Sequence, residues 1–252
     1  MQDRLASLRR PARLGVLAVA AVLWGCAESS TAPAGEEVTL TTSDGLSISG
    51  MAWPAKADTP RSGVLLLHQL EDTRRQWDAY IQGLLDEGYR VLAIDLRSHG
   101  ESDDATVDRG ALVAERDQAL LDVEAAFEWF AGDEGTDPEH LGVIGTGLGG
   151  SLAIAAAHAG FGADLTVAVS ARETNVTALA GEELANLSLR GLFVVASEEE
   201  SGGEQATSAN DLYEQSTPPR KLRVLPGSAS GSDLVAAGDV WFDILDFLQL
   251  EL

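Results

Sequence analysis

The stretch Val143-Ile144-Gly145-Thr146-Gly147-Leu148-Gly149-Gly150-Ser151 decides the fold of this chain. A short apolar run leads into a cluster of glycines, and an Ala-rich segment, 148–159, follows at once. This pattern predicts a buried strand, a sharp turn and a helix. Glycines suit such a turn because they tolerate positive φ and allow a strand and a helix to approach closely.

Outside this stretch, apolar runs and helical stripes alternate along the chain. Strands are predicted at 38–42, 46–53, 63–68, 90–95, 141–145, 165–169, 192–196 and 222–225. Helices are predicted around 77–85, 120–130, 148–159, 212–213 and 241–250. The first two strands form a hairpin about Ser43-Asp44-Gly45. The alternation predicts an α/β fold, a single mostly parallel sheet with helices on both faces and little or no cap.

Composition limits the possible functions. The chain has 252 residues and is 45% apolar, enough for one well-packed domain, expected over 37–252. It carries 40 acidic and 17 basic residues, a formal charge of −23. Such a surface repels phosphate backbones, so no nucleic-acid partner is expected.

The N-terminal end has the pattern of an exported protein. Basic residues in 1–13 precede a ten-residue apolar run, 14–23, which is too short to span a bilayer and typical of a signal peptide over 1–25. The segment Leu23-Trp24-Gly25-Cys26 resembles the lipobox of bacterial lipoproteins, which implies acylation of Cys26, a tether over 26–36 and a membrane-anchored, periplasm-facing protein. An ordinary secretory peptide is the alternative.

Two interpretations of the central turn compete. It has the frame of a nucleophile elbow, G-x-S-x-G, with Gly147 in place of the serine. It also matches G-x-G-x-x-G, through Gly145, Gly147 and Gly150, as in dinucleotide-binding turns. A dinucleotide fold usually opens with this turn and ends its next strand in an acid, whereas here the turn lies in mid-chain and Arg172 follows the next strand.

Four other stretches favour the elbow. They are Leu67-His68-Gln69-Leu70 with Trp77, the loop from Asp95 to Ser102 (DLRSHGES), Val195-Ala196-Ser197-Glu198-Glu199-Glu200, and the segment from Leu225 to Leu234 (LPGSASGSDL). In this order they resemble the α/β-hydrolase family, and most closely its dienelactone-hydrolase-like members. The resemblance implies an α/β-hydrolase fold.

The resemblance also implies where a catalytic triad would lie. The nucleophile position is Gly147, the base position is Ser230, and the acid position is Glu200 or its neighbour Glu199. A triad acts as a unit, and here two members lack the required group, so ordinary acyl-enzyme chemistry is not expected.

Other parts of such a site are expected to persist. By likeness to the family, the main-chain N–H groups of Leu148 and of Gln69 or Leu70 would form an oxyanion hole. His68, His99 and Thr146 are further candidates for the pocket, with a role in bracing their loops as the simpler expectation for the two histidines.

The sequence therefore predicts a lipid-anchored, inactive hydrolase-fold protein that binds a small neutral carbonyl compound or a protein partner. A rewired esterase, using Thr146 or Ser151 with His68 or His99, is one alternative, and a dinucleotide-binding protein is another. No cofactor or metal is expected, since no histidine spacing suits zinc and the run 198–200 is expected to be solvated.

Overall fold

A computed structural model describes residues 33–55, 59–103, 112, 116–250 and 252. Its strands form one sheet of eight, in the order β1-β2-β4-β3-β5-β6-β7-β8. The strands are β1 (Glu36–Thr41), β2 (Ser47–Trp53), β3 (Arg61–Leu67), β4 (Arg90–Ile94), β5 (Thr136–Thr146), β6 (Leu165–Val169), β7 (Arg190–Ser197) and β8 (Thr217–Leu225).

The sheet is mostly parallel. β2 pairs antiparallel with both β1 and β4, and every other neighbouring pair runs parallel. The loops that follow β3, β5, β6, β7 and β8 therefore leave the sheet at the same edge. In open α/β sheets, ligand sites form at the carboxyl ends of the strands.

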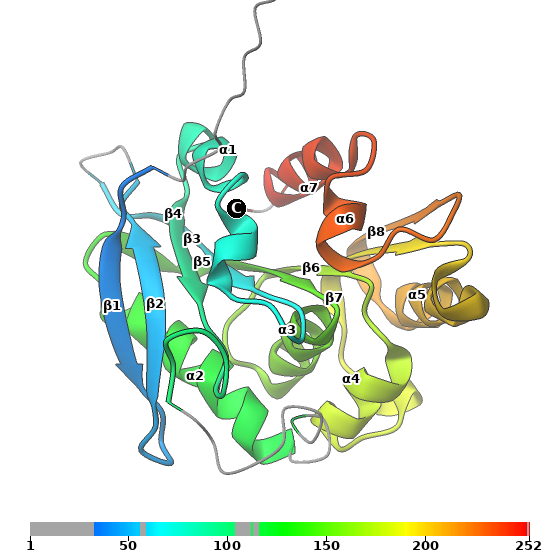
Figure 1. Cartoon of the computed structure of the whole chain (residues 1–252), viewed down its shortest axis with the longest axis horizontal. Helices are drawn as coiled ribbons and strands as arrows, with labels where there is room; N and C mark the ends of the chain where they lie inside the picture. Colours follow the sequence, from blue (N-terminus) through cyan, green and yellow to red (C-terminus); the bar gives the residue numbers. More distant parts are fainter. Residues whose placement is uncertain (1–32, 56–58, 104–111, 113–115, 251) are drawn as a thin grey trace, which may run out of the picture.

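Helices cover both faces of this sheet (Figure 1). The helices are α1 (Ile81–Asp86), α2 (Arg116–Gly132), α3 (Leu148–Ala159), α4 (Glu173–Ala180), α5 (Glu204–Gln215), α6 (Gly231–Val235) and α7 (Val240–Leu248). α1, α6 and α7 pack on one face, and α2, α3, α4 and α5 pack on the other.

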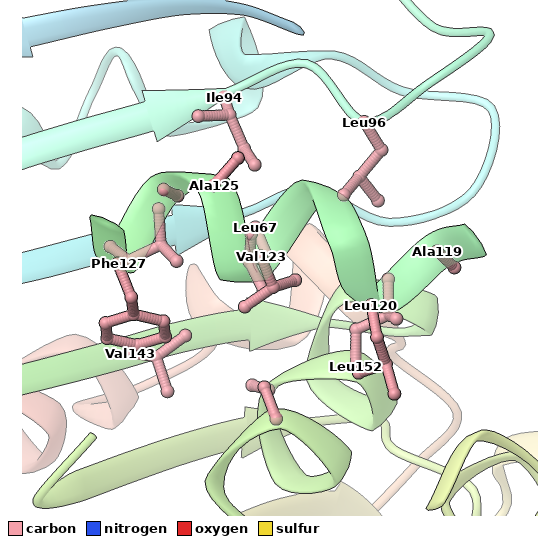
Figure 2. Close-up of a cluster of buried hydrophobic side chains, with 14 of the residues drawn as sticks. Leu67, Ile94, Leu96, Ala119, Leu120, Val123, Ala125, Phe127, Val143 and Leu152 are labelled. Carbon is pink, nitrogen blue, oxygen red and sulfur yellow. The ribbon is translucent and has the colours of Figure 1, made fainter. Parts of the chain in front are cut away.

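The core follows the two-residue period of the strands. In β3, Leu65 and Leu67 face the helices α2 and α3, whereas Val64 and Leu66 face α1 and α7. All four side chains are fully buried. Figure 2 shows Leu67 and Val143 of the sheet against Val123 and Phe127 of α2. Burial on both faces explains why the central strands are continuous apolar runs in the sequence.

The predicted α/β fold is confirmed, and the structure differs from the prediction in several details. β5 begins at Thr136, five residues before the predicted start. α4 and α6 form where no helix was predicted, and β8 begins at Thr217, five residues before the predicted start. The run 198–200 is solvated only in part, since Glu198 and Glu199 are exposed but Glu200 is buried.

Several sequence predictions fall outside the described residues. They concern the signal peptide, Cys26 and most of the tether, and part of the segment between β4 and α2 where a cap would lie. Within the described part of the chain, no helix is long and apolar enough to cross a membrane, and no group of three metal-binding side chains gathers.

Candidate functional site

The turn between β5 and α3 has an unusual backbone conformation at its centre. Gly147 adopts φ 54° and ψ −115°, outside the regions that L-residues populate readily. Its N–H donates to the carbonyl of Val169 at the end of β6, with an N···O distance of 2.8 Å. The turn is therefore a sharp elbow, fixed to the neighbouring strand, and it begins a twelve-residue helix.

The flanking glycines are required by close packing. A Cβ at Gly145 would collide with the main chain of Gly149, and a Cβ at Gly149 would lie 2.5 Å from the carbonyl oxygens of Leu67 and His68. At Gly147 a Cβ would lie 3.2 Å from the Cβ of Gln69. Close packing thus requires glycine at both ends of the G-x-x-x-G frame. A Cβ at the central position, Gly147, would make a close contact but would not collide with the main chain.

A pocket of about 400 Å³ opens at this elbow, and we call it the elbow pocket. Loops that follow β3, β5, β6, β7 and β8 all contribute to it. Its lining includes Gln69, Gly147, Leu148, Ser170, Arg172, Glu200, Gln205 and Ser230. The structure therefore brings the three predicted triad positions and both predicted oxyanion-hole residues to one cavity.

Glu200, at the acid position, is held by a hydroxyl. Ser170 Oγ donates to Glu200 Oε2 at 2.9 Å and accepts the main-chain N–H of Gly231 at 2.8 Å. Ser170 thereby links the acid to the last loop, a connection that an imidazole makes in a Ser-His-acid triad. Burial raises the pKa of Glu200, and the hydrogen bonds from Ser170 and Gln205 oppose that rise.

Ser230, at the base position, lies at the mouth of the pocket. It is exposed and immediately precedes α6. Its hydroxyl has no basic nitrogen with which to accept a proton near neutral pH. The structure thus brings Gly147, Glu200 and Ser230 to one cavity, with no side chain at the predicted nucleophile position and a hydroxyl in place of an imidazole at the predicted base position.

Two glutamines occupy the predicted oxyanion-hole side of the elbow. The Gln69 N–H donates to Gln76 Oε1 at 3.1 Å, and Gln76 Nε2 donates to Thr146 Oγ1 at 2.8 Å. The Gln69 side chain then crosses to the last loop, where its Oε1 accepts the N–H of Ser232 at 3.1 Å. The N–H of Gln69, one of the two alternatives expected to act beside that of Leu148, is therefore already paired inside the protein.

The histidines His68 and His99 are buried and do not line the elbow pocket. His68 Nδ1 lies 2.7 Å from the carbonyl of Gln69, and its Nε2 accepts the N–H of Leu96 at 3.0 Å. His99 Nδ1 lies 2.9 Å from the carbonyl of Arg97. Burial lowers the pKa of His68 to about 4, so its ring is neutral at physiological pH. Both rings brace loops through the main chain.

The two hydroxyls considered as substitute nucleophiles are engaged elsewhere. Ser151 Oγ donates to the carbonyl of Gly147 at 3.2 Å and accepts the N–H of Arg172 at 3.3 Å. Thr146 is fully buried and accepts from Gln76. Each described contact joins these hydroxyls to a backbone or amide group.

Sequence reasoning missed Ser170, Gln205 and Gln76. Gln205 is only 3% exposed, and its Nε2 donates to the Ser170 carbonyl at 3.0 Å and to Glu200 Oε1 at 3.4 Å. These partners lie 35 and 5 residues away in the chain. Only the position of Ser170 directly after a predicted strand could have pointed to it, since loop residues there reach the carboxyl edge of the sheet.

Comparisons with known proteins agree with this architecture. The model of the α/β hydrolase fold family matches residues 64–160. An uncharacterized protein of Mycobacterium tuberculosis is 27% identical over 126 residues, which are 50% of this chain and 42% of that protein. The chain thus matches about two fifths of the length of this curated relative.

Solved structures resemble the chain over most of its length. An esterase of Pyrococcus furiosus aligns with a TM-score of 0.67 and 20% identity, over 86% of this chain and 93% of its own. The α/β hydrolase GrgF from a Penicillium species aligns with a TM-score of 0.66 and 18% identity, over 87% and 99% of the two chains. With the sheet order and the elbow, these likenesses show that the chain has the α/β-hydrolase fold.

Proposed function

We propose that this chain is a non-catalytic, dienelactone-hydrolase-like protein that binds a small polar ligand in the elbow pocket. The observation that carries the proposal is the elbow itself: Gly147 keeps the backbone conformation that displays a nucleophile, φ 54° and ψ −115°, but has no side chain. Ser230 at the base position cannot replace an imidazole. Without nucleophile and base, the remaining acid Glu200 has nothing to orient.

The charge of the protein favours a ligand without net charge. Two of the described residues that line the elbow pocket are charged, Arg172 and Glu200, and they have opposite signs. The chain as a whole carries −23, and its field opposes the approach of anions. A neutral carbonyl compound fits these conditions, and a protein partner remains the other outcome for this surface.

The two alternative functions have less support. An esterase with a rewired nucleophile would need Thr146 or Ser151 to reach an imidazole, but their hydroxyls bond Gln76, Gly147 and Arg172. A dinucleotide-binding turn is followed by a second strand that ends in an acid, which binds the ribose of the cofactor. Here β6 is followed by Arg172, and the turn lies in mid-chain.

We also propose that the protein is a bacterial lipoprotein anchored through acylated Cys26 and facing the periplasm. The support is the sequence alone: a basic start, a ten-residue apolar run and Leu23-Trp24-Gly25-Cys26. Cells that express the full chain and are fed a radioactive fatty acid should label it. A Cys26→Ser variant should lose this label, and equal labelling of the variant would refute the anchor.

The test of the non-catalytic function is activity-based labelling. The purified full-length chain should form no adduct with a fluorophosphonate and should hydrolyse p-nitrophenyl acetate no faster than buffer. The Pyrococcus furiosus esterase, treated in parallel, provides the active control. A covalent adduct on this chain that disappears in Thr146→Ala or Ser151→Ala would instead establish the rewired hydrolase.

A further inference from the structure

Gln205 lines the elbow pocket, and the oxygen of its side-chain amide is a buried acceptor without a partner among the described residues. Gln205 is 97% buried (3% exposed), and its Oε1 bonds nothing in the described part of the chain. The orientation of this amide is fixed by its neighbours. The Ser170 carbonyl and Glu200 Oε1 are both acceptors, so the amide group that faces them must be the NH₂ of Gln205. A buried acceptor left unpaired costs free energy, so a ligand that donates an N–H or O–H there would be stabilised.

A negative charge lies beside this acceptor. Glu200 is 92% buried (8% exposed) and already accepts from Ser170 and Gln205, one hydrogen bond to each carboxylate oxygen. Each carboxylate oxygen can accept a second hydrogen bond. A donor that carries positive charge gains most next to a buried carboxylate, since charge-assisted hydrogen bonds are about twice as strong as neutral ones. An ammonium group has three donors, enough for both Gln205 Oε1 and Glu200.

The pocket also offers groups that suit a carboxylate. Leu148 is the first residue of the twelve-residue helix α3, so its N–H has no acceptor within the helix and lies at the positive end of the helix dipole. Arg172 lines the same pocket and commits its Nη2 to Ser201 Oγ at 2.7 Å. Its charge also acts on Glu200, whose pKa it lowers, and among the described residues its other guanidinium N–H groups have no hydrogen bond, so they can bind a planar anion.

We propose that the elbow pocket binds a zwitterion, a free α-amino acid or a molecule with the same paired ammonium and carboxylate. The ammonium contacts Gln205 Oε1 and Glu200, and the carboxylate contacts Arg172 and the N-terminus of α3. This inference rests on the non-catalytic binding function proposed above and names the class of its ligand. A zwitterion has no net charge, so the −23 of the chain does not oppose it. A pocket of about 400 Å³ holds an amino acid with room for its side chain.

The first test is a binding titration with the full-length chain. Each of the twenty standard L-amino acids is screened by thermal shift, and the most stabilising one is titrated by calorimetry. Its methyl ester keeps the ammonium and loses the carboxylate charge, and its N-acetyl derivative does the opposite. Each change should raise Kd at least about tenfold, which corresponds to the loss of one charge-assisted hydrogen bond. Equal binding of either derivative, or binding of no amino acid, would overturn the proposal.

Two variants assign the two ends of the ligand. Arg172→Gln should weaken binding of the free amino acid about tenfold but leave the affinity for its methyl ester unchanged, because the ester lacks the charge that Arg172 binds. Arg61→Gln, at the opposite edge of the sheet, is the matched control. Gln205→Met should weaken the binding of both ligands. Asn210→Met, on the exposed side of the same helix, should leave both affinities unchanged. Unchanged affinity in Arg172→Gln and Gln205→Met would overturn the assignment.

The fluorophosphonate assay on the same preparation separates the two proposals. An adduct would refute the non-catalytic function on which the inference rests. No adduct, together with binding of uncharged carbonyl compounds in preference to amino acids, would leave the function standing and refute only the zwitterion.

Discussion

His68 illustrates how one buried residue can look functional and serve the fold. Its ring is fully buried, with one nitrogen beside the Gln69 carbonyl and the other accepting the Leu96 N–H. Protonation would place a charge in the core and remove the acceptor that Leu96 needs. Burial is accordingly the main cause of the low pKa, about 4, against an ordinary 6.5.

Stability should therefore fall as the solution is acidified. Between pH 6.5 and 4, His68 is protonated in the unfolded chain but neutral in the folded one. The stabilisation of the folded state by neutral His68 is therefore complete above pH 6.5 and is lost toward pH 4. The shift corresponds to roughly 3 kcal/mol in the free energy of unfolding. Urea denaturation from pH 7.5 to 4.5 should show this loss in the wild type and less of it in His68→Asn.

His140→Asn is the control, because His140 is half-exposed and bonds only Asp137 at 3.0 Å in the described contacts. It should follow the wild-type pH profile. A His68 ring that titrates near 6.5 by NMR would contradict the prediction directly.

The strand–turn–helix unit depends on contact between backbones. The Cα of Gly149 in α3 faces the carbonyls of Leu67 and His68 at the end of β3, with no room for a methyl group. This contact sets how closely the helix lies over the sheet, and with it where the N-terminus of α3 points into the elbow pocket.

Gly149→Ala should destabilise the protein by about 3 kcal/mol or more, because main-chain atoms must move to admit the Cβ. Gly132→Ala, at the end of α2 with nothing within 4 Å of the new Cβ, should be neutral or slightly stabilising. Urea denaturation of both variants measures the difference. Equal stabilities would mean that the elbow tolerates a wider separation than the structure shows.

Most elements could be predicted because burial leaves a clear pattern. The strands under both helix layers are continuous apolar runs, and β6 and α3 have the predicted bounds. α4 and α6 were missed because they are short, with few buried positions to establish a helical period. β8 was predicted too short because Pro218 and Pro219 look like strand breakers, although an edge strand tolerates proline.

The site was predictable only where a family motif places a residue. Gly147, Glu200 and Ser230 follow from spacing along the chain and share one pocket. The roles of Ser170 and Gln76 arise from partners 30 and 70 residues away, and no local pattern encodes such pairings.

At the scale of the whole molecule, charge is the dominant feature. With 40 acidic and 17 basic residues, acidic side chains repel one another over the surface, and this repulsion opposes the compact state. Raising NaCl from 0.05 to 0.5 M shortens the Debye length from above 10 Å to below 8 Å, so about 2 °C or more should be added to Tm. KCl should give the same rise, since screening does not depend on which cation is used. A Tm that falls with both salts would show that the basic residues, through their ion pairs, dominate instead.

If the protein is non-catalytic, as proposed above, the hydrogen bond from the Gln69 main chain to Gln76 bears on whether mutation could introduce catalysis. With Gln69 as the second oxyanion donor, installing a serine at Gly147 and a histidine at Ser230 would still leave a developing negative charge facing an N–H whose proton is already shared with a carboxamide. A third change, one that releases this carboxamide, would have to accompany them, and by itself it would bring no advantage on which selection could act. With a site of this kind, losing catalysis would take fewer changes than gaining it.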